Sequence, residues 1–175
     1  MNIVNDRSLI KLAAQGDMDA FGELVQLHQS AAFNVAYRML GNRRDAEDAA
    51  QEAFIRAYKA FDKFDTKRSF RPWIKQITTN LCLNRINSHK PTLPLENDLP
   101  PPKEPYPGPE AQTANSEQDA QIRAAILLLK PGYRAVIELR HFQDLNYEEI
   151  AESLDKPLST VKSDLFRARK ILAEK

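Results

Sequence analysis

The sequence predicts an all-α protein, built as two small helical domains joined by a Pro-rich linker. Three observations lead there. Apolar residues recur at helical spacing along most of the chain, and no segment keeps the alternating period of a strand. Eight of the eleven prolines lie between residues 91 and 109, where no hydrophobic period is sustained. The last thirty residues contain two short periodic segments across a tight turn, the pattern of a helix-turn-helix. We therefore expect domains at residues 1–90 and 113–175 and a linker at 91–112.

The first domain is expected to contain four helices. They cover residues 9–15, 17–40, 45–60 and 70–89. Gly16 and Gly41 are suited to ending the first two helices, Asp17 can cap the second, and Pro72 is tolerated in the first turn of the fourth. Residues 61–69 are too polar and irregular for a core element, which makes them a candidate binding loop.

The second domain is also expected to contain four helices. They cover residues 116–129, 133–142, 147–154 and 159–169, and the last two form the helix-turn-helix. One apolar seam between these two helices consists of Ile150, Leu154, Val161 and Leu165. Ala151 is small enough to let the helices cross closely, and Ser159 is a suitable N-cap for the last helix.

Composition narrows the classes of function. No apolar run reaches the length of a membrane span and no signal peptide is visible, so we expect no membrane insertion and a cytoplasmic location. The single cysteine, Cys82, excludes an internal disulfide and reads as a small buried residue. The three histidines are scattered, and we predict no metal, no cofactor and no catalytic residue.

The net charge is +1, but basic and acidic residues are concentrated in different parts of the chain. Residues 63–90 hold seven basic side chains against one acidic, whereas residues 91–120 hold one against six. A basic block of this kind is suited to binding a polyanion. The acidic linker is suited to lying in a basic channel, or to serving as a solvated tether.

The basic block interleaves cations with aromatic residues and amides. Cations and aromatic faces together hold unstacked single-stranded bases, and amides can read the edge of an extruded base. The competing interpretation makes the aromatics core residues, which helical spacing favours for Phe70 and Trp73, while Phe64 and the loop cations are harder to bury. The candidates are Lys63, Phe64, Lys67, Arg68, Ser69, Phe70, Trp73, Lys75, Gln76, Asn80 and Asn84.

The last helix offers a second candidate surface, for duplex DNA. Side chains that could reach bases or phosphates from it are Ser159, Thr160, Lys162, Ser163, Phe166, Arg167 and Arg169. The alternative is an ordinary helical hairpin whose basic residues form a solvated face.

An acidic cluster begins the third helix. It comprises Asp45, Glu47, Asp48 and Glu52, and Gln51 is expected to look outward beside it. Carboxylates are favoured at a helix start by the backbone dipole, and no nucleophile, histidine or phosphate-binding loop accompanies them. A solvated helix start and a charged docking surface for a partner protein both remain open.

Three stretches together resemble a known family. They are Asp45-Ala46-Glu47-Asp48-Ala49-Ala50-Gln51-Glu52-Ala53-Phe54; Phe70-Arg71-Pro72-Trp73-Ile74 with Asn80; and Tyr147-Glu148-Glu149-Ile150-Ala151 with Thr160-Val161-Lys162-Ser163 and Arg167-Ala168-Arg169. The chain resembles bacterial sigma factors of the extracytoplasmic-function (ECF) type in the sigma-70 superfamily, over both domains and in the right order.

The resemblance implies a function and partners. The first domain would dock on a coiled coil of the largest subunit of core RNA polymerase through Asp45, Asp48, Gln51 and Glu52. The loop at residues 63–69, with Trp73 and Asn80, would capture a flipped base of the minus-ten promoter element, and the last helix would read the minus-thirty-five element. The linker would thread the polymerase cleft, and an anti-sigma factor would inhibit the free protein.

The chain departs from the family pattern at four positions. Gln76 stands where arginine is frequent, Ser159 where glycine is frequent, and Pro72 where a small residue is usual. Asp164 lies in the last helix where a basic residue is common, and it would repel phosphate if it faced DNA. Promoter sequence preference therefore does not follow from the resemblance.

The sequence thus favours a transcription initiation factor that confers promoter choice on RNA polymerase and helps melt the promoter, without being an enzyme. A stand-alone helix-turn-helix regulator, with a sensing or dimerising first domain, is the main alternative. A recombinase or nuclease that uses the acidic cluster is a further alternative, disfavoured because no nucleophile lies beside the carboxylates.

Overall fold

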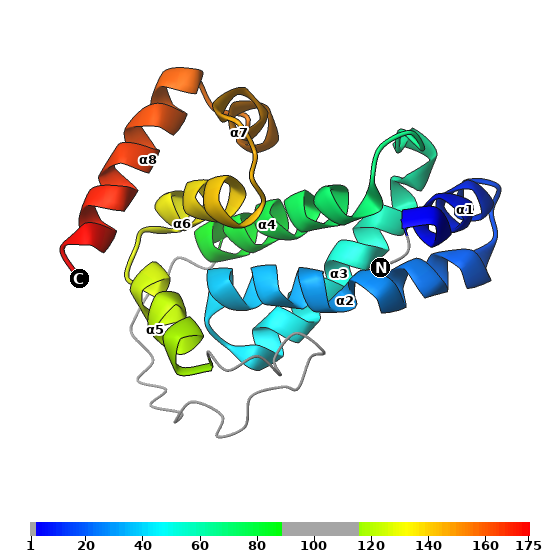
Figure 1. The fold of residues 1–175 in the computed structure, drawn as a ribbon, viewed down its shortest axis with the longest axis horizontal. Coiled ribbons are helices and arrows are strands. Elements are labelled where there is room, and N and C mark those ends of the chain that lie inside the picture. Colours follow the sequence, from blue (N-terminus) through cyan, green and yellow to red (C-terminus); the bar gives the residue numbers. More distant parts are fainter. Residues whose placement is uncertain (1–2, 89–115) are drawn as a thin grey trace.

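The computed structural model describes residues 3–88 and 116–175 of the 175-residue chain. The described part is helical (Figure 1). The elements are α1 (Ile3–Ala14), α2 (Met18–Leu40), α3 (Arg43–Lys59), a short 3₁₀ turn (Phe61–Lys63), α4 (Phe70–Ser88), α5 (Ser116–Leu127), α6 (Pro131–Ile137), a π-helical turn (Glu138–Phe142), α7 (Tyr147–Leu154) and α8 (Leu158–Ala173). The expected linker at residues 91–112 lies outside the described residues.

Helices α1 to α4 enclose one hydrophobic core. The longest helix, α2, contributes Leu24, Val35 and Met39, which are fully buried. The alanines of α3 form its inner face, because every alanine from Ala46 to Ala57 is buried. Small side chains on α3 let the neighbouring helices approach closely, so the outward face of α3 is held rigidly against the core.

Local signals fix the ends of the first helices as expected. Asp17 caps α2 by accepting a hydrogen bond from the backbone N–H of Ala20 at 3.1 Å. Gly41 ends α2 in the left-handed conformation at φ 74°, and a Cβ there would lie 2.7 Å from Leu127 Cδ1 of α5. The left-handed φ favours glycine at this position, and a larger residue would also require the end of the Leu127 side chain to move.

The second domain packs α6, α7 and α8 around a smaller core. Its buried residues are Leu129, Val136, Ile137, Leu139, Leu145, Ile150, Val161, Leu165 and Ala168. α7 begins with a reciprocal capping box between Asn146 and Glu149. Of the predicted seam, Ile150, Val161 and Leu165 are buried as expected, and Leu154 is partly buried against both domain cores.

The expected cap of the last helix was wrong, and one expected helix has an irregular end. α8 begins at Leu158 after Pro157, so Ser159 lies in the first turn and does not cap the helix. Pro157 has φ fixed near −58° and an extended ψ of 144°, which sets the helix start one residue earlier. The segment expected as one helix over residues 133–142 is helical throughout, but α6 widens into a π-helical turn at Glu138, which pairs with Arg38 of the first domain.

The two domains are in contact. Figure 1 shows α5 beside α2 and α6 beside α4. Ala135 of α6 belongs to the core cluster of the first domain. The guanidinium of Arg134 donates to the backbone carbonyl of Met39 at 2.8 Å and to that of Leu127 at 2.9 Å, which ties α6 to the end of α2 and to α5.

Candidate nucleic-acid interface

The loop between α3 and α4 is a compact, cationic turn. Asp65 closes it, because its carboxylate accepts the backbone N–H of Lys67 at 3.0 Å and its carbonyl accepts that of Arg68 at 2.9 Å. Lys63, Lys67 and Arg68 are exposed, as is Ser69. A short turn thus presents three predicted cations to solvent at the start of α4.

The aromatic side chains behind this loop form one cluster. Phe64, expected to resist burial, is 8% exposed, with its ring centroid 4.4 Å from that of Trp73. The expectation was wrong because Phe64 folds back over Phe61, Phe70 and Trp73. Phe70 is completely buried, as its helical spacing favoured, whereas Trp73 is half-buried. Among these aromatics, Trp73 is therefore the better placed to meet a base.

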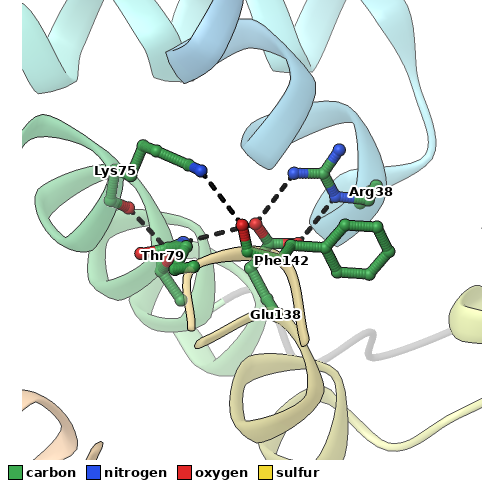
Figure 2. Close-up of polar contacts among 6 residues, drawn as sticks. Arg38, Lys75, Thr79, Glu138 and Phe142 are labelled. Carbon is green, nitrogen blue, oxygen red and sulfur yellow. Dashed lines mark hydrogen bonds and ion pairs between the residues drawn. The ribbon is translucent and has the colours of Figure 1, made fainter. Parts of the chain in front are cut away.

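Two of the candidate residues on α4 contact the second domain. Lys75 Nζ donates to the carbonyl of Phe142 at 3.2 Å, and Asn80 Nδ2 donates to the carbonyl of Ser153 at 2.9 Å (Figure 2 for Lys75). Gln76 is half-buried and Asn84 is exposed. The helix that carries the candidate base-binding residues is thus also a docking face within the chain.

The predicted outer face of α8 is present. Ser159, Lys162, Phe166, Arg167 and Arg169 are exposed, and Thr160 and Ser163 are half-buried. Phe166 is 70% exposed, unusual for a phenylalanine within a helix and compatible with an apolar contact to a base methyl group. Val161, Leu165 and Ala168 form the buried side of α8, and all the candidate residues lie on the opposite side.

Asp164, on the same helix, forms an ion pair with Lys156. Its carboxylate lies 3.5 Å from Lys156 Nζ, and its side chain is only 14% exposed. The ion pair joins α8 to the turn that follows α7. The repulsion of phosphate considered for Asp164 is accordingly reduced by a paired cation.

The acidic face of α3 is exposed except at Glu52. Asp45, Asp48 and Gln51 are exposed, but Glu52 is half-buried and accepts hydrogen bonds from Arg56 and from Arg85 of α4. These hydrogen bonds, chiefly that from Arg85, lower the pKa of Glu52 below its usual value. Glu52 therefore also fastens α3 to α4.

Sequence reasoning missed Ile55 on the same helix. Its side chain is 55% exposed, one turn beyond Gln51 and on the face that Asp48 and Gln51 share. An apolar side chain beside polar ones is the usual composition of a protein-docking face. The signal was present in the sequence, because Ile55 follows Asp48 by seven residues and Gln51 by four, which places an apolar side chain on their side of the helix.

Titratable groups in the first domain are structural. Cys82 is buried, as expected, and burial raises its pKa to about 12, which keeps the thiol protonated. His28 is buried beside Asp6 at 3.0 Å, and burial lowers its pKa. Within the described ranges we find no cluster of side chains that could hold a metal ion. Nor does any helix there have the length and apolar character of a membrane span.

Comparison with known proteins decides the family. Residues 24–92 match the family Sigma-70 region 2, and residues 119–172 match Sigma-70, region 4. The ECF RNA polymerase sigma factor SigW of Bacillus subtilis (strain 168) is 38% identical and aligns over 93% of this chain and 92% of its own. The chain belongs to the ECF sigma factors. It is therefore a transcription initiation sigma factor, and a stand-alone regulator is not favoured.

Further relatives agree with this assignment. The ECF RNA polymerase sigma-E factor of Escherichia coli (strain K12) is 30% identical over 98% of this chain and 94% of its own. The structure of CnrH in complex with the cytosolic domain of CnrY is 27% identical, with a TM-score of 0.63 over 97% of this chain and 96% of that one. The sigma factor RpoE of Bartonella quintana, with a TM-score of 0.66 over 88% of this chain and 94% of that one at 21% identity, shares the fold. Members of this family are not enzymes.

Proposed function

We propose that this sigma factor binds core RNA polymerase through α3, the minus-thirty-five element through α8, and the melted minus-ten element through α4 and the loop before it. The observation that carries the proposal is that the chain has three separate exposed faces. The face on α3 is acidic, and those on the loop and on α8 are basic, in a protein that matches both sigma-70 regions. We assign polymerase docking and the minus-ten element to residues 1–90 and the minus-thirty-five element to residues 113–175.

The α8 face is suited to duplex DNA. Arg167 and Arg169 can contact phosphates or guanine edges, and Lys162 can add a phosphate contact. Ser159, Thr160, Ser163 and Phe166 complete the face along the first turns of the helix. An exposed helix of this length enters the major groove without change of fold.

The loop and α4 are suited to single-stranded DNA. Lys63, Lys67 and Arg68 provide the electrostatic attraction for the backbone, and Trp73 provides a ring against which a base can stack. Asn80 and Gln76 can read the edge of a flipped base. Phe64 and Phe70 serve by holding Trp73 in place, since both are buried against it.

The α3 face is suited to docking on the polymerase. Asp45, Asp48 and Gln51 are exposed on a helix held rigidly by its alanines, and Ile55 adds an apolar contact. Glu52 adds a carboxylate to this docking face, and its ion pair with Arg85 fixes the position of that carboxylate. We further propose that catalysis belongs to the polymerase and that the protein acts in the cytoplasm. An anti-sigma factor would restrain it: CnrH, which is 27% identical, was solved in complex with the cytosolic domain of CnrY, and RpoE, which shares the fold, in complex with the anti-sigma factor NepR.

A fluorescent base analogue in the minus-ten element tests the proposal. When holoenzyme containing the parent chain binds, the fluorescence of the analogue should rise as the base leaves the stack. Lys67→Ala with Arg68→Ala should reduce that change, because two phosphate-binding cations are lost. Lys11→Ala, on an exposed face of α1, is the matched control and should behave as the parent. An unchanged signal in the loop variant would exclude the loop from the interface.

A further inference from the structure

A histidine and an arginine meet where the π-helical turn lies against α8. His141, on the turn, has its Nε2 atom 3.3 Å from Nε of Arg169, on α8. Both side chains are exposed. Arg169 belongs to the α8 face that we assign to duplex DNA, so His141 extends this face onto a second element of the domain.

The contact determines the protonation state of His141. The Nε–H group of a guanidinium can only donate a hydrogen bond, so Nε2 of the imidazole accepts it. The imidazole then carries its single proton on Nδ1 and is neutral. A second proton, on Nε2, would set one N–H group against another and would break this hydrogen bond.

The charges that face His141 disfavour that second proton. Burial lowers the pKa of His141 below its usual value of 6.5, and Arg169 from α8 and Arg140 from the turn itself lower it further. Asp144, which follows the turn, acts in the opposite sense. An anion placed between His141 and Arg169 would remove the repulsion between the two cations and would favour the protonated imidazole.

The backbone that carries His141 is anchored on the side of α7. Nη1 of the neighbouring Arg140 donates to the carbonyl of Leu145 at 2.9 Å, and the guanidinium lies 5.2 Å from the ring centroid of Tyr147. Arg140 thus ties the turn to the start of α7. Because the turn is held in place, an anion can be bound by rotation of the His141 and Arg169 side chains alone.

We propose that His141 and Arg169 together bind one backbone phosphate of the upstream promoter duplex, and that His141 takes up a proton from solvent as it does so. The inference rests on the proposed function of α8. The phosphate oxygens accept hydrogen bonds from the Nε2–H group of the imidazolium and from the guanidinium, both of them charge-assisted. The phosphodiester itself stays ionised.

Proton uptake makes the affinity for DNA depend on pH. The phosphate raises the pKa of His141 in the complex above that of the free site, so the complex holds more protons than its separate parts. The gain in affinity is therefore complete below the pKa of the free site. It is lost as the pH rises through the higher pKa of the complex.

The affinity of holoenzyme for an upstream-element duplex, measured by fluorescence anisotropy at about pH 6 and about pH 8, tests the inference. Holoenzyme with the parent chain should bind about fivefold more tightly at the lower pH. The logarithmic slope of affinity against salt should also be steeper there by about one unit, because one more cation meets a phosphate.

Two variants assign this pH dependence to a residue. His141→Gln keeps an acceptor for Arg169 but cannot take up a proton, so it should match the parent at about pH 8 and gain little affinity at about pH 6. His28→Gln is the matched control, since His28 is buried beside Phe70 in the first domain. It should keep the pH dependence of the parent.

Equal pH dependence and equal salt slopes in the parent and in His141→Gln would overturn the inference. A loss of affinity in His141→Gln that is the same at both pH values would also overturn it, since a residue that only positions Arg169 behaves in this way. Neither outcome bears on the proposed function of α8. That function fails if Arg167→Ala, on the same helix, leaves the affinity unchanged at both pH values.

Discussion

At the residue scale, buried polar side chains set the response of the first domain to acid. His28 has Nε2 beside Asp6, while its Nδ1 is buried with no partner among the described residues. Burial lowers its pKa from 6.5, and Asp6 opposes that shift only in part. The native state therefore resists protonation of a histidine that protonates readily in the unfolded chain.

The free energy of unfolding should accordingly fall as the pH drops below about 6.5, where the unfolded chain binds a proton that the native chain does not. His28→Gln keeps a donor for Asp6 but removes the titration. Urea unfolding at about pH 7.5 and at about pH 5.5 should show a smaller loss of stability in His28→Gln than in the parent. An equal loss in the two proteins would assign the acid sensitivity to other groups.

The environments of some individual side chains could be predicted from the sequence, and those of others could not. The burial of Cys82 and the cap at Asp17 depend on neighbours in the chain, and both were predictable. The burial of Phe64 against Trp73 and the pairing of Asp164 with Lys156 depend on how the chain turns between helices. Spacing along a helix carries no information about such turns.

At the element scale, the face of α3 that we propose for docking includes one residue that also stabilises the fold. Gln51 contacts solvent, whereas Glu52 is bonded to Arg85 of α4. Gln51→Ala should weaken co-purification with core polymerase and leave the unfolding midpoint unchanged. Glu52→Ala should weaken it as well and also destabilise the fold by about 0.2–1 kcal/mol, the usual value of a partly exposed ion pair.

The contrast between these two variants is measured by pull-down and by urea unfolding of the same preparations. Lys59→Ala, at the exposed end of α3, serves as the control for a change on the same helix. Undiminished capture of core polymerase by Gln51→Ala would remove Gln51 from the docking face.

On α8, Arg167 is exposed and has no role in the core of the second domain. Arg167→Ala should weaken binding of the holoenzyme to an upstream-element duplex by about 1–3 kcal/mol, through a lost base or phosphate contact. Fluorescence anisotropy at fixed salt measures this. Lys175→Ala, at the exposed chain end beyond α8, should bind as the parent, and matching affinities for all three proteins would contradict the assignment.

The helices themselves were largely predictable, because each has an apolar face at helical spacing and a recognisable cap or breaker. The start of α8 differed by one residue because Pro157 outweighs the capping preference of Ser159. The π-helical turn at Glu138–Phe142 was not predictable, since its hydrogen bonds follow from contacts with the first domain rather than from local preference.

At the scale of the whole molecule, Arg134 joins three parts of the chain. Its guanidinium donates to the carbonyls of Met39, Leu127 and Leu129, and its burial lowers its pKa without depriving it of charge. Arg134→Met should reduce the free energy of unfolding by about 1.5–3 kcal/mol, the usual range for hydrogen bonds to a charged group. Arg134→Lys should recover little, because one ammonium cannot reach three carbonyls in this geometry, and full recovery would contradict the network.

The division into two helical domains could be read from the prolines and the hydrophobic period, but their docking could not. The contacts that close the molecule come from polar residues scattered over α2, α4 and the segment after α6, with no spacing in common. Their partners lie 67 to 100 residues away in the chain, a separation at which local patterns say nothing.

Runoff transcription with purified core polymerase on a promoter library tests the central claim most directly. Specific start sites should appear only when this chain is added, with two conserved elements upstream of them, and they should be lost when Gln51→Ala and Arg167→Ala are combined. Core polymerase that initiates nowhere new in the presence of the chain, while the chain alone binds duplex DNA tightly, would contradict the account.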